Sequence, residues 1–367
     1  MRHPAKNDLF TTVVMAHPKR AESASKLART VGPGVRVIFD PDPDGPPSSS
    51  RAAARAWRYC DTTAGHHLVL QDDVVPTPHL LESVGRAISA YPDAVLALYA
   101  NSNSWHGGAA RVALLAGYGW VNWAPLEYFP TVAAVMPCRI AHEFAELAER
   151  QDSVDSDADA RKDDMLMRSF LAARKYRALV RTSALVEHRA MVSIAGNDMN
   201  EVRRSVRLAA PDDVPDARES LLAEVPAWPN FAYRRAVLKM PVKHDRSSFR
   251  TQGRADHLMS VGLRWDEVRA LSDELWKELP SIPERNSTAR RFAEELCLAS
   301  YTAGWTLAAV QGPGVGRPLR SPATDAALRS YAEAGLAYES AVDLWADHFD
   351  ILVDFMWWLV EIGRTRA

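Results

Sequence analysis

Short apolar runs alternate with helix-like stretches along the first hundred residues of the chain. Four runs are rich in apolar and β-branched residues, as buried strands are, and they lie at 9–16, 35–39, 67–71 and 95–100. Helical patterns separate them at 22–30, 50–60 and 78–90. Strands that alternate with helices predict an α/β domain built on a mostly parallel sheet, with helices packed on its faces.

The pattern changes after residue 101. Two strand-like stretches, at 111–123 and 131–136, are joined by a loop rich in Gly, Trp and Tyr, which predicts that part of the sheet is mixed. A helical stretch at 139–150 follows, and the last strand-like stretches lie at 178–181 and 184–186. We therefore place the end of the first domain near residue 205.

Beyond about residue 200 the strand-like pattern disappears. Apolar residues recur at helical spacing in four stretches, at 264–279, 284–305, 322–345 and 347–362. The pattern predicts an all-α C-terminal domain over 206–367, after an N-terminal domain over 1–205. A chain of 367 residues is long enough for two domains that each bury a core.

Polar residues stand directly after each of the first four predicted strands. They are His17 with Arg20, Asp40, Asp72 with Asp73, and Asn101 with Ser102 and Asn103. In open α/β sheets ligands bind beyond the carboxyl ends of the strands. These side chains therefore predict a ligand-binding crevice.

Two adjacent carboxylates, Asp72 and Asp73, follow the apolar run at 67–71. Carboxylate oxygens are suitable ligands for a hard divalent cation, which could neutralise a bound diphosphate. The alternative is that the two acids begin the next helix, because Asp is a favoured N-cap. Thr77 and Pro78 form a better helix start, which places the acids several residues upstream of it. Both interpretations stay open on the sequence.

A second pair of acids, Asp163 and Asp164, opens a helix-like stretch with apolar residues at Leu166 and Phe170. Either acid can cap the helix, and either can be a general base that faces the crevice. Adjacent residues on a helix point about 100° apart, so only one of the two can face the crevice well, and periodicity does not choose between them. His188 follows the last strand-like stretch and becomes a candidate ligand only if it lies beside the carboxylates.

The composition is that of an ordinary globular protein and excludes few classes of binding partner. A net charge of −2 and a pI near 6.6 give no overall attraction to nucleic acid or to an anionic membrane. The three cysteines are odd in number and far apart, which predicts no disulfide framework and a reducing compartment. No secretory signal is evident, and the most apolar stretch, 351–362, contains two acids and is too short to span a bilayer. We expect a cytoplasmic protein without a transmembrane segment.

The segment 231–259 is locally basic, with seven Lys or Arg residues against two Asp residues. It could bind a polyanionic acceptor, including nucleic acid, or pair with the acidic tract at 152–159 in the folded protein. We favour the pairing because it needs no partner.

The order of these elements and the motif Leu70-Gln71-Asp72-Asp73-Val74 resemble the nucleotide-sugar-dependent glycosyltransferases of the GT-A fold. Among them, the motif is similar to that of the bacterial lipopolysaccharide-type transferases, which carry an acidic pair after an apolar strand. The resemblance covers about residues 9–197. It implies a GT-A, Rossmann-like N-terminal domain that uses Mn²⁺ or Mg²⁺ and takes a nucleoside diphosphate sugar as its donor.

The resemblance also implies which residues would form the donor pocket. The pocket would begin with the residues that follow the first strand, namely Ala16, His17, Pro18 and Arg20. Asp40 would lie near the base or the ribose. Arg51 could add a charge-assisted hydrogen bond to phosphate.

The same resemblance implies the metal ligands and the base. Asp72 and Asp73 would stand for the acidic motif of the family, with Asp73 and His188 as metal ligands and Asp72 on the donor. Asp163 or Asp164 would be the acid that activates the acceptor, with Asp164 slightly favoured. The family usually has an acid where Gln71 stands, which leaves open which of the two following Asp residues contacts the metal.

We therefore expect a metal-dependent glycosyltransferase that moves a sugar from a nucleoside diphosphate sugar to an acceptor hydroxyl. The acceptor could be a saccharide, a natural product or, less favoured, a modified nucleic acid. The alternative is a GT-A-fold protein without turnover, which binds a nucleotide and acts as a scaffold through its basic segment and helical domain. The C-terminal helices could also form a homo-oligomer.

Overall fold

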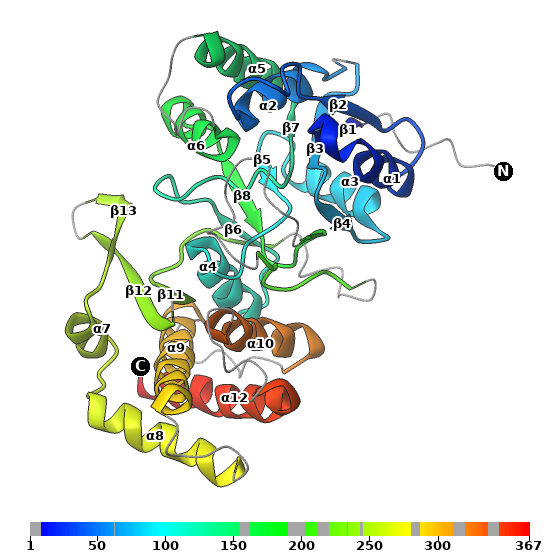
Figure 1. The fold of residues 1–367 in the computed structure, drawn as a ribbon. Helices are drawn as coiled ribbons and strands as arrows, with labels where there is room; N and C mark the ends of the chain where they lie inside the picture. Colours follow the sequence, from blue (N-terminus) through cyan, green and yellow to red (C-terminus); the bar gives the residue numbers. More distant parts are fainter. Residues whose placement is uncertain are drawn as a thin grey trace, which may run out of the picture. The chain divides into compact units, whose positions relative to one another are not determined.

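The computed structural model describes residues 9–61, 63–153, 162–189, 203–210, 220–232, 234–242, 245–279, 287–311, 320–336 and 345–367. The chain divides into two compact units, which are drawn in Figure 1. The first comprises residues 1–100 and 122–219, and the second comprises residues 101–121 and 220–367. This division differs from the expected boundary at 205/206, because an early segment of the chain belongs to the second unit.

The first unit is built on a mixed sheet. Its strands are β1 (Phe10–Ala16), β2 (Arg36–Phe39), β3 (His66–Gln71), β5 (Val95–Ala97), β7 (Ala133–Pro137) and β8 (Ala178–Arg181). They lie in the order β8-β5-β7-β3-β1-β2. β7 is antiparallel to both of its neighbours, whereas the other neighbouring pairs are parallel. The prediction of an α/β unit with a mixed, mostly parallel sheet is confirmed.

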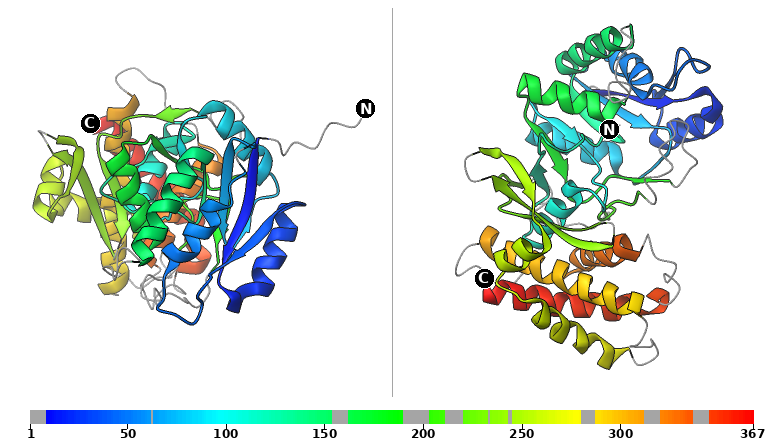
Figure 2. Two further views of the ribbon diagram at one scale, coloured as in Figure 1. Left: turned by 90° about the horizontal axis from the view of Figure 1, so that it is seen from above. Right: turned by 60° about the vertical axis from the view of Figure 1, so that its left-hand side comes forward.

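Helices cover both faces of this sheet, as Figures 1 and 2 show. One face carries α2 (Ser49–Arg58), α5 (Cys138–Ser153) and α6 (Asp163–Arg174), and the other carries α1 (Ala21–Val31) and α3 (Leu80–Ala90). In β3, Leu68, Val69 and Leu70 are at most 1% exposed. A strand enclosed on both faces needs apolar residues at consecutive positions, which explains the continuous apolar run.

A short ribbon fixes the chain that leaves β3. β4 (Val74–Pro76) pairs antiparallel with β9 (Val186–His188), and Val74 lies opposite His188. The strand end that carries the first acid pair is therefore tied to a segment that comes much later in the chain.

The second unit contains strands as well as helices, so the prediction of an all-α C-terminal domain is wrong. β11 (Trp228–Ala232), β12 (Arg235–Val242) and β13 (Asp245–Thr251) form an antiparallel sheet. A short parallel pair joins β6 (Trp120–Asn122) to β10 (Leu221–Leu222). Basic residues interrupt the apolar pattern of β12 and β13, so the hydrophobic pattern of the sequence does not predict these strands.

The remaining elements of the second unit are helical. The stretch 111–123, which was expected to be a strand, first completes the helix α4 (Trp105–Leu115) and only then enters β6. Ser104 caps α4, because its Oγ accepts a hydrogen bond from Gly107 N at 3.0 Å. The other helices are α7 (Arg254–Ser260), α8 (Trp265–Glu278), α9 (Ser287–Gln311), α10 (Pro322–Leu336) and α12 (Phe349–Arg366).

The helices α9 and α12 pack closely because each carries a glycine where it meets the other. A side chain at Gly304 would collide with the Val360 carbonyl, and one at Gly363 would collide with the Tyr301 carbonyl. The backbones approach so closely that neither position can accept a Cβ without a shift. Glycine is therefore used here for space, at a cost in helix propensity.

The second unit contains a buried cation, Arg111 of α4. It donates from Nε to Ser330 Oγ at 2.7 Å and from Nη1 to Asn230 Oδ1 at 3.1 Å. Nη2 reaches the carbonyls of Ser102 at 2.8 Å and Ser330 at 3.1 Å. The guanidinium carbon lies 4.1 Å from the centre of the Tyr331 ring. Burial lowers the pKa of Arg111 to about 10, so the side chain stays charged at neutral pH.

The basic segment 231–259 contributes β12, β13 and α7. Within the second unit, Arg254 pairs with the buried Glu295, and Lys239 Nζ lies 4.1 Å from the centre of the Trp105 ring. Residues 154–159 of the acidic tract lie outside the described residues. The pairing of the basic segment with that tract therefore stays a prediction.

The cysteines depart from the sequence-based expectation. Cys60 and Cys138 form a disulfide with their Cα atoms 5.7 Å apart, and Cys297 is a buried free thiol. The bond joins the end of α2 to the start of α5 on one face of the sheet. The prediction of no disulfide is wrong because only the fold brings together two residues that are 78 positions apart. Cysteine usage therefore no longer supports a reducing, cytoplasmic location.

The apolar stretch near the C-terminus lies in α12, where Leu352, Met356 and Leu359 are fully buried in the core of the second unit. Within the parts of the chain that the structure describes, no helix has the length and apolar character needed to cross a membrane.

The disulfide predicts that reduction weakens the fold. A cross-link that closes a loop of this length typically contributes about 2–4 kcal/mol to the free energy of unfolding. Urea unfolding of the parent protein should therefore shift to a lower midpoint when a reductant is added. The double variant Cys60→Ser/Cys138→Ser should have the lower urea midpoint from the outset, and that midpoint should not change when the reductant is added. A parent midpoint that does not respond to reduction would show that the bond does not form in solution.

Candidate functional site

The turn after β1 folds over the first carboxylate of the pair. His17 caps the short 3-10 helix η1 (Pro18–Arg20), because its Nδ1 accepts a hydrogen bond from Lys19 N at 3.1 Å. Pro18 suits the first helical position, since it lacks an N–H and its φ is already fixed. The turn directs both the His17 N–H and the Arg20 side chain toward Asp72.

Asp72 is buried, with 5% of its surface exposed. Its Oδ2 accepts from His17 N at 3.2 Å, and its Oδ1 accepts from Arg20 Nη1 at 2.8 Å. Burial raises the pKa of Asp72, and the hydrogen bond and charge of Arg20 oppose that rise. The Arg20 guanidinium thereby favours the ionised form of the buried Asp72 carboxylate.

Asp73 shares Arg20 but keeps one oxygen without a partner. Arg20 Nη1 donates to Asp73 Oδ2 at 3.1 Å, whereas the buried Oδ1 has no hydrogen-bond partner among the described residues. His188 Nε2 lies 3.6 Å from Asp73 Oδ2, in the place where the β4–β9 ribbon puts it. Burial lowers the pKa of His188, so the imidazole is neutral at pH 7 and can offer a lone pair.

Asp73 and His188 fit part of a divalent-metal site. Among the residues that the structure describes, no cluster of three or more His, Cys, Asp or Glu side chains is placed to hold a metal ion. Mg²⁺ is commonly bound through one or two carboxylates, with substrate phosphates and water completing its coordination. Asp73 Oδ1 and His188 Nε2 are the protein atoms suited to such an ion, whereas Asp72 is engaged by Arg20 and His17.

Asp40 and Arg51 bind each other. Arg51 donates to the two carboxylate oxygens of Asp40, from Nε at 2.8 Å and from Nη2 at 3.0 Å. Arg51 also donates to the carbonyls of Asp42 at 2.5 Å and Pro46 at 3.2 Å. The pair thus secures the loop that follows β2. Contacts of these two side chains with a donor substrate stay a prediction.

Asp163 is the more firmly held acid of the second pair. It is 6% exposed and lies in the first turn of α6. Gln71 Nε2 donates to its Oδ2 at 3.1 Å, and its own N–H donates to Ser49 Oγ at 3.0 Å. Since Gln71 ends β3 and Ser49 begins α2, Asp163 connects the strand end to two helices.

Asp164 is less buried, and its proton affinity is higher than that of an ordinary aspartate. Its Oδ1 accepts a local hydrogen bond from Met165 N at 2.8 Å. Burial, and after it the neighbouring charge of Asp163, raises the pKa of Asp164 to about 6. Such a carboxylate is mostly ionised at neutral pH and still accepts a proton readily, as a general base must. The two acids thus differ in burial and in hydrogen-bond partners, although helical periodicity does not distinguish them.

Tyr99 and Glu187 surround His188, although the sequence did not single them out. The Tyr99 and His188 rings lie 6.5 Å apart. Glu187 accepts hydrogen bonds from Ser205 N at 2.8 Å and Ser205 Oγ at 2.7 Å, which ties β9 to the segment 203–210. Tyr99 comes soon after β5, so attention to residues beyond strand ends could have found it.

Arg203 is a further residue that sequence reasoning missed. Its carbonyl accepts a hydrogen bond from Tyr99 Oη at 3.0 Å. Its positive charge opposes the burial that raises the pKa of Asp164 and adds to the burial that lowers the pKa of His188. Arg203 thus places a cation near both His188 and Asp164. Neither periodicity nor a motif marks it in the sequence.

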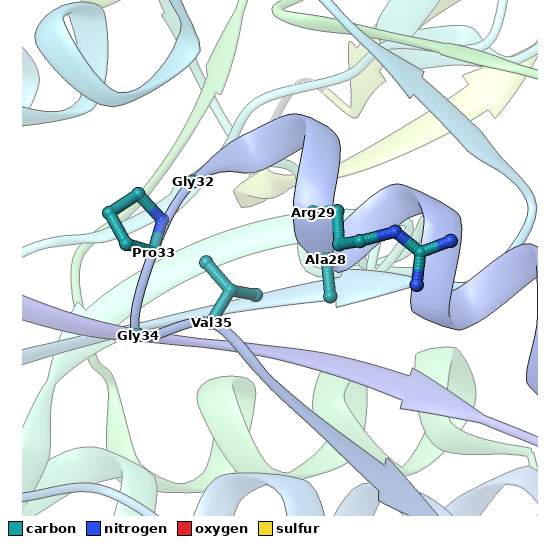
Figure 3. Close-up of a pocket in the computed structure, with 6 residues that line it drawn as sticks. All are labelled: Ala28, Arg29, Gly32, Pro33, Gly34 and Val35. Carbon is teal, nitrogen blue, oxygen red and sulfur yellow. The ribbon is translucent and has the colours of Figure 1, made fainter.

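A surface hollow of about 320 Å³ lies elsewhere in the first unit (Figure 3). It is lined by Ala28, Arg29, Gly32, Pro33, Gly34 and Val35. These residues join the end of α1 to the start of β2, whereas the site residues follow the ends of the strands. We assign the hollow no role in the site.

Comparisons with known proteins gave no family assignment, since neither a family model nor a curated protein sequence matches the chain.

The raised pKa of Asp164 predicts that this residue lowers stability at neutral pH. The folded protein binds the Asp164 proton more tightly than the unfolded chain does, so stability falls as pH rises from the ordinary aspartate range through about 6. Asp164→Asn should raise the free energy of unfolding by about 1–2 kcal/mol above pH 7 and have little effect near pH 4. Urea unfolding at both pH values measures the difference. Asp93→Asn, at an exposed acid, is the matched control and should show no such gain.

Proposed function

We propose that the first unit is a metal-dependent glycosyltransferase of the GT-A type, which moves a sugar from a nucleoside diphosphate sugar to an acceptor hydroxyl. The observation that carries the proposal is the arrangement at the end of β3. There, Asp73 keeps its buried Oδ1 without a hydrogen-bond partner among the described residues, and its Oδ2 lies 3.6 Å from Nε2 of the neutral His188. Gln71 connects this place to Asp163 of α6. The mixed α/β sheet supports the proposal, because ligands of such sheets bind beyond the strand ends.

The donor side of the site supplies positive charge. A departing diphosphate gains negative charge in the transition state, and groups fixed in advance around it lower the barrier. Arg20 binds the acid pair, and the positive charge of Arg203 acts on His188. When bound at Asp73 and His188, Mn²⁺ or Mg²⁺ would neutralise further charge on the diphosphate.

The acceptor side supplies a base. In a direct, inverting displacement, the acceptor oxygen forms a bond to the anomeric carbon while the bond from that carbon to the diphosphate oxygen breaks. The electron pair of the broken bond leaves with the nucleoside diphosphate. The proton of the acceptor hydroxyl goes to the Asp164 carboxylate, whose pKa of about 6 suits this step near neutral pH.

A nucleotide-binding scaffold without turnover is the second candidate. Arg20 favours it, because its guanidinium donates to both Asp72 and Asp73 and so reduces their need for a metal ion. Such a protein would bind a nucleoside diphosphate equally well with and without metal, and it would neither hydrolyse nor transfer a donor sugar.

Donor binding can be tested by thermal stability of the full chain. Uridine, guanosine and thymidine diphosphate sugars are added separately, each with Mn²⁺ or with a chelator. A ligand at 100 times its Kd that binds only the folded protein adds about 2.7 kcal/mol of stability. We expect at least one donor to raise the melting temperature with Mn²⁺ and to lose most of this effect with chelator. A rise in melting temperature that is the same with Mn²⁺ and with chelator would support the scaffold hypothesis. If none of the donors raises the melting temperature, the protein does not bind these nucleotide sugars.

The metal ligand can be tested with Asp73→Ala. This variant should keep the circular dichroism of the parent and lose the Mn²⁺-dependent part of donor binding, because it removes the unpartnered carboxylate oxygen. Asp93→Ala deletes an exposed acid, with 89% of its side-chain surface accessible, and should bind like the parent. If a folded Asp73→Ala protein shows the same Mn²⁺-dependent donor binding as the parent, Asp73 is not a metal ligand.

The base can be tested with Asp164→Asn. Donor binding should persist, whereas transfer, or donor hydrolysis if water is the acceptor, should fall by a factor of about 10² or more. In the parent, kcat/KM should rise with pH through about 6 and then level off, because the ionised carboxylate is the active form. Asp163→Asn should have the smaller effect. If Asp163→Asn abolishes transfer and Asp164→Asn does not, the two roles are reversed.

A further inference from the structure

Gln71 lies between the acid pair at the end of β3 and the acid pair at the start of α6. Its backbone is held in the sheet, where it pairs with Met15 of β1 and donates its N–H to Val132 O at 2.9 Å. Its side-chain Nε2 donates to Asp163 Oδ2 at 3.1 Å and to Thr131 Oγ1 at 3.2 Å. The residue immediately before Asp72 thus reaches directly to the acid beside the candidate base.

We propose that Gln71 is a positioning residue for the reaction: its amide N–H holds the Asp163 carboxylate, and Asp164 is thereby left as the acid that receives the acceptor proton. This inference rests on the proposed function for its catalytic meaning. Gln71 does not itself contact the reacting atoms.

The chemistry of the amide supports this role. An amide N–H can donate a hydrogen bond to a carboxylate oxygen, and the Gln71 amide does so at Asp163 Oδ2, which fixes the position of that carboxylate. A carboxylate at position 71 would have no N–H to donate and would repel Asp163 from the same distance. The place of Gln71 before the acid pair therefore suits an amide better than an acid.

The charge on Asp163 then acts on Asp164. After burial, that charge is the next cause of the raised pKa of Asp164. Among the described residues, the Met165 N–H and the positive charges of Lys162 and Arg203 also act on Asp164, and all three lower its pKa. The negative charge of Asp163 opposes these three groups, and Gln71 holds its carboxylate.

The test compares Gln71→Met with Ser49→Ala in the full chain. Gln71→Met removes the N–H that reaches the Asp163 carboxylate, while Ser49→Ala removes the hydroxyl that binds the Asp163 backbone N–H. Both variants loosen the start of α6, but only the first acts on the carboxylate. Aspartate ¹³C-carboxyl titration by NMR, without metal or donor, reports the protonation of Asp164, whose signal is assigned by its loss in Asp164→Asn.

We expect Gln71→Met to lower the midpoint of the Asp164 titration by about half a pH unit or more, because a carboxylate that Gln71 no longer holds acts less strongly on Asp164. Ser49→Ala should leave the midpoint unchanged. In the transfer or donor-hydrolysis assay, Gln71→Met should lower kcat about tenfold with the donor KM unchanged. Should Gln71→Met fail to fold, Gln71→Leu removes the same donor with a different side-chain shape.

An Asp164 midpoint that is the same in the parent, Gln71→Met and Ser49→Ala would overturn the inference and leave Gln71 as a structural tether. Equal shifts in both variants would also overturn it, because they would come from movement of the helix start. A shift confined to Gln71→Met, in a protein that binds no nucleotide sugar, would uphold the coupling of Gln71 to Asp164 while removing the proposed transferase function.

Discussion

Two adjacent carboxylates at the end of a buried strand impose the main constraint on the first unit. An unpaired charge in such a place costs several kcal/mol, so the surrounding chain must supply cations and N–H groups. The turn after β1 does this with Arg20 and the His17 N–H, which both bind Asp72. Among the described residues, Asp73 Oδ1 has no hydrogen-bond partner, and His188 lies beside Oδ2 of the same carboxylate. The geometry therefore satisfies one acid within the protein and leaves the other with capacity to bind a ligand.

The N-terminal turn of α2 links the parts of the site. Arg51 binds Asp40 and the loop after β2, and Ser49 accepts the Asp163 N–H at the start of α6. At its other end, α2 is joined to α5 through the disulfide of Cys60. One helix is thus tied to the loop after β2, to the acids of α6 and to its neighbour on the sheet. Its position on the face of the sheet bears on both the donor and the acceptor side of the proposed reaction.

The second unit also contains a buried charge, which is a cation and not an acid. Arg111 is fully buried, and its hydrogen bonds reach residues from three separate parts of the chain, among them Ser102, Asn230 and Ser330. A guanidinium without these partners would be costly to bury, so α4 must stay with β11 and α10. This explains physically why residues 101–121 belong to the second unit, although they follow the strands of the first directly in sequence.

Local patterns in the sequence were sufficient to predict β1, β3 and β5, the helices between them and the polar residues beyond the strand ends. These features depend on the spacing of apolar residues and on turn chemistry, which are properties of neighbours in the chain. These patterns do not reveal β12 and β13, in which basic residues interrupt the apolar run, and they predict a strand where α4 ends. They could not distinguish Asp163 from Asp164, which differ in what they contact and not in their local sequence.

The tertiary structure decided which distant residues meet. It paired Cys60 with Cys138, placed His188 beside Asp73, and brought Gln71 to Asp163. Burial and neighbouring charges then set the proton affinities of Asp164 and His188, and Arg203 acts on both. The residue types of this site could be read from the sequence. Their hydrogen-bond partners and protonation could not, because electrostatic energies depend on distances and burial that exist only after the chain has folded.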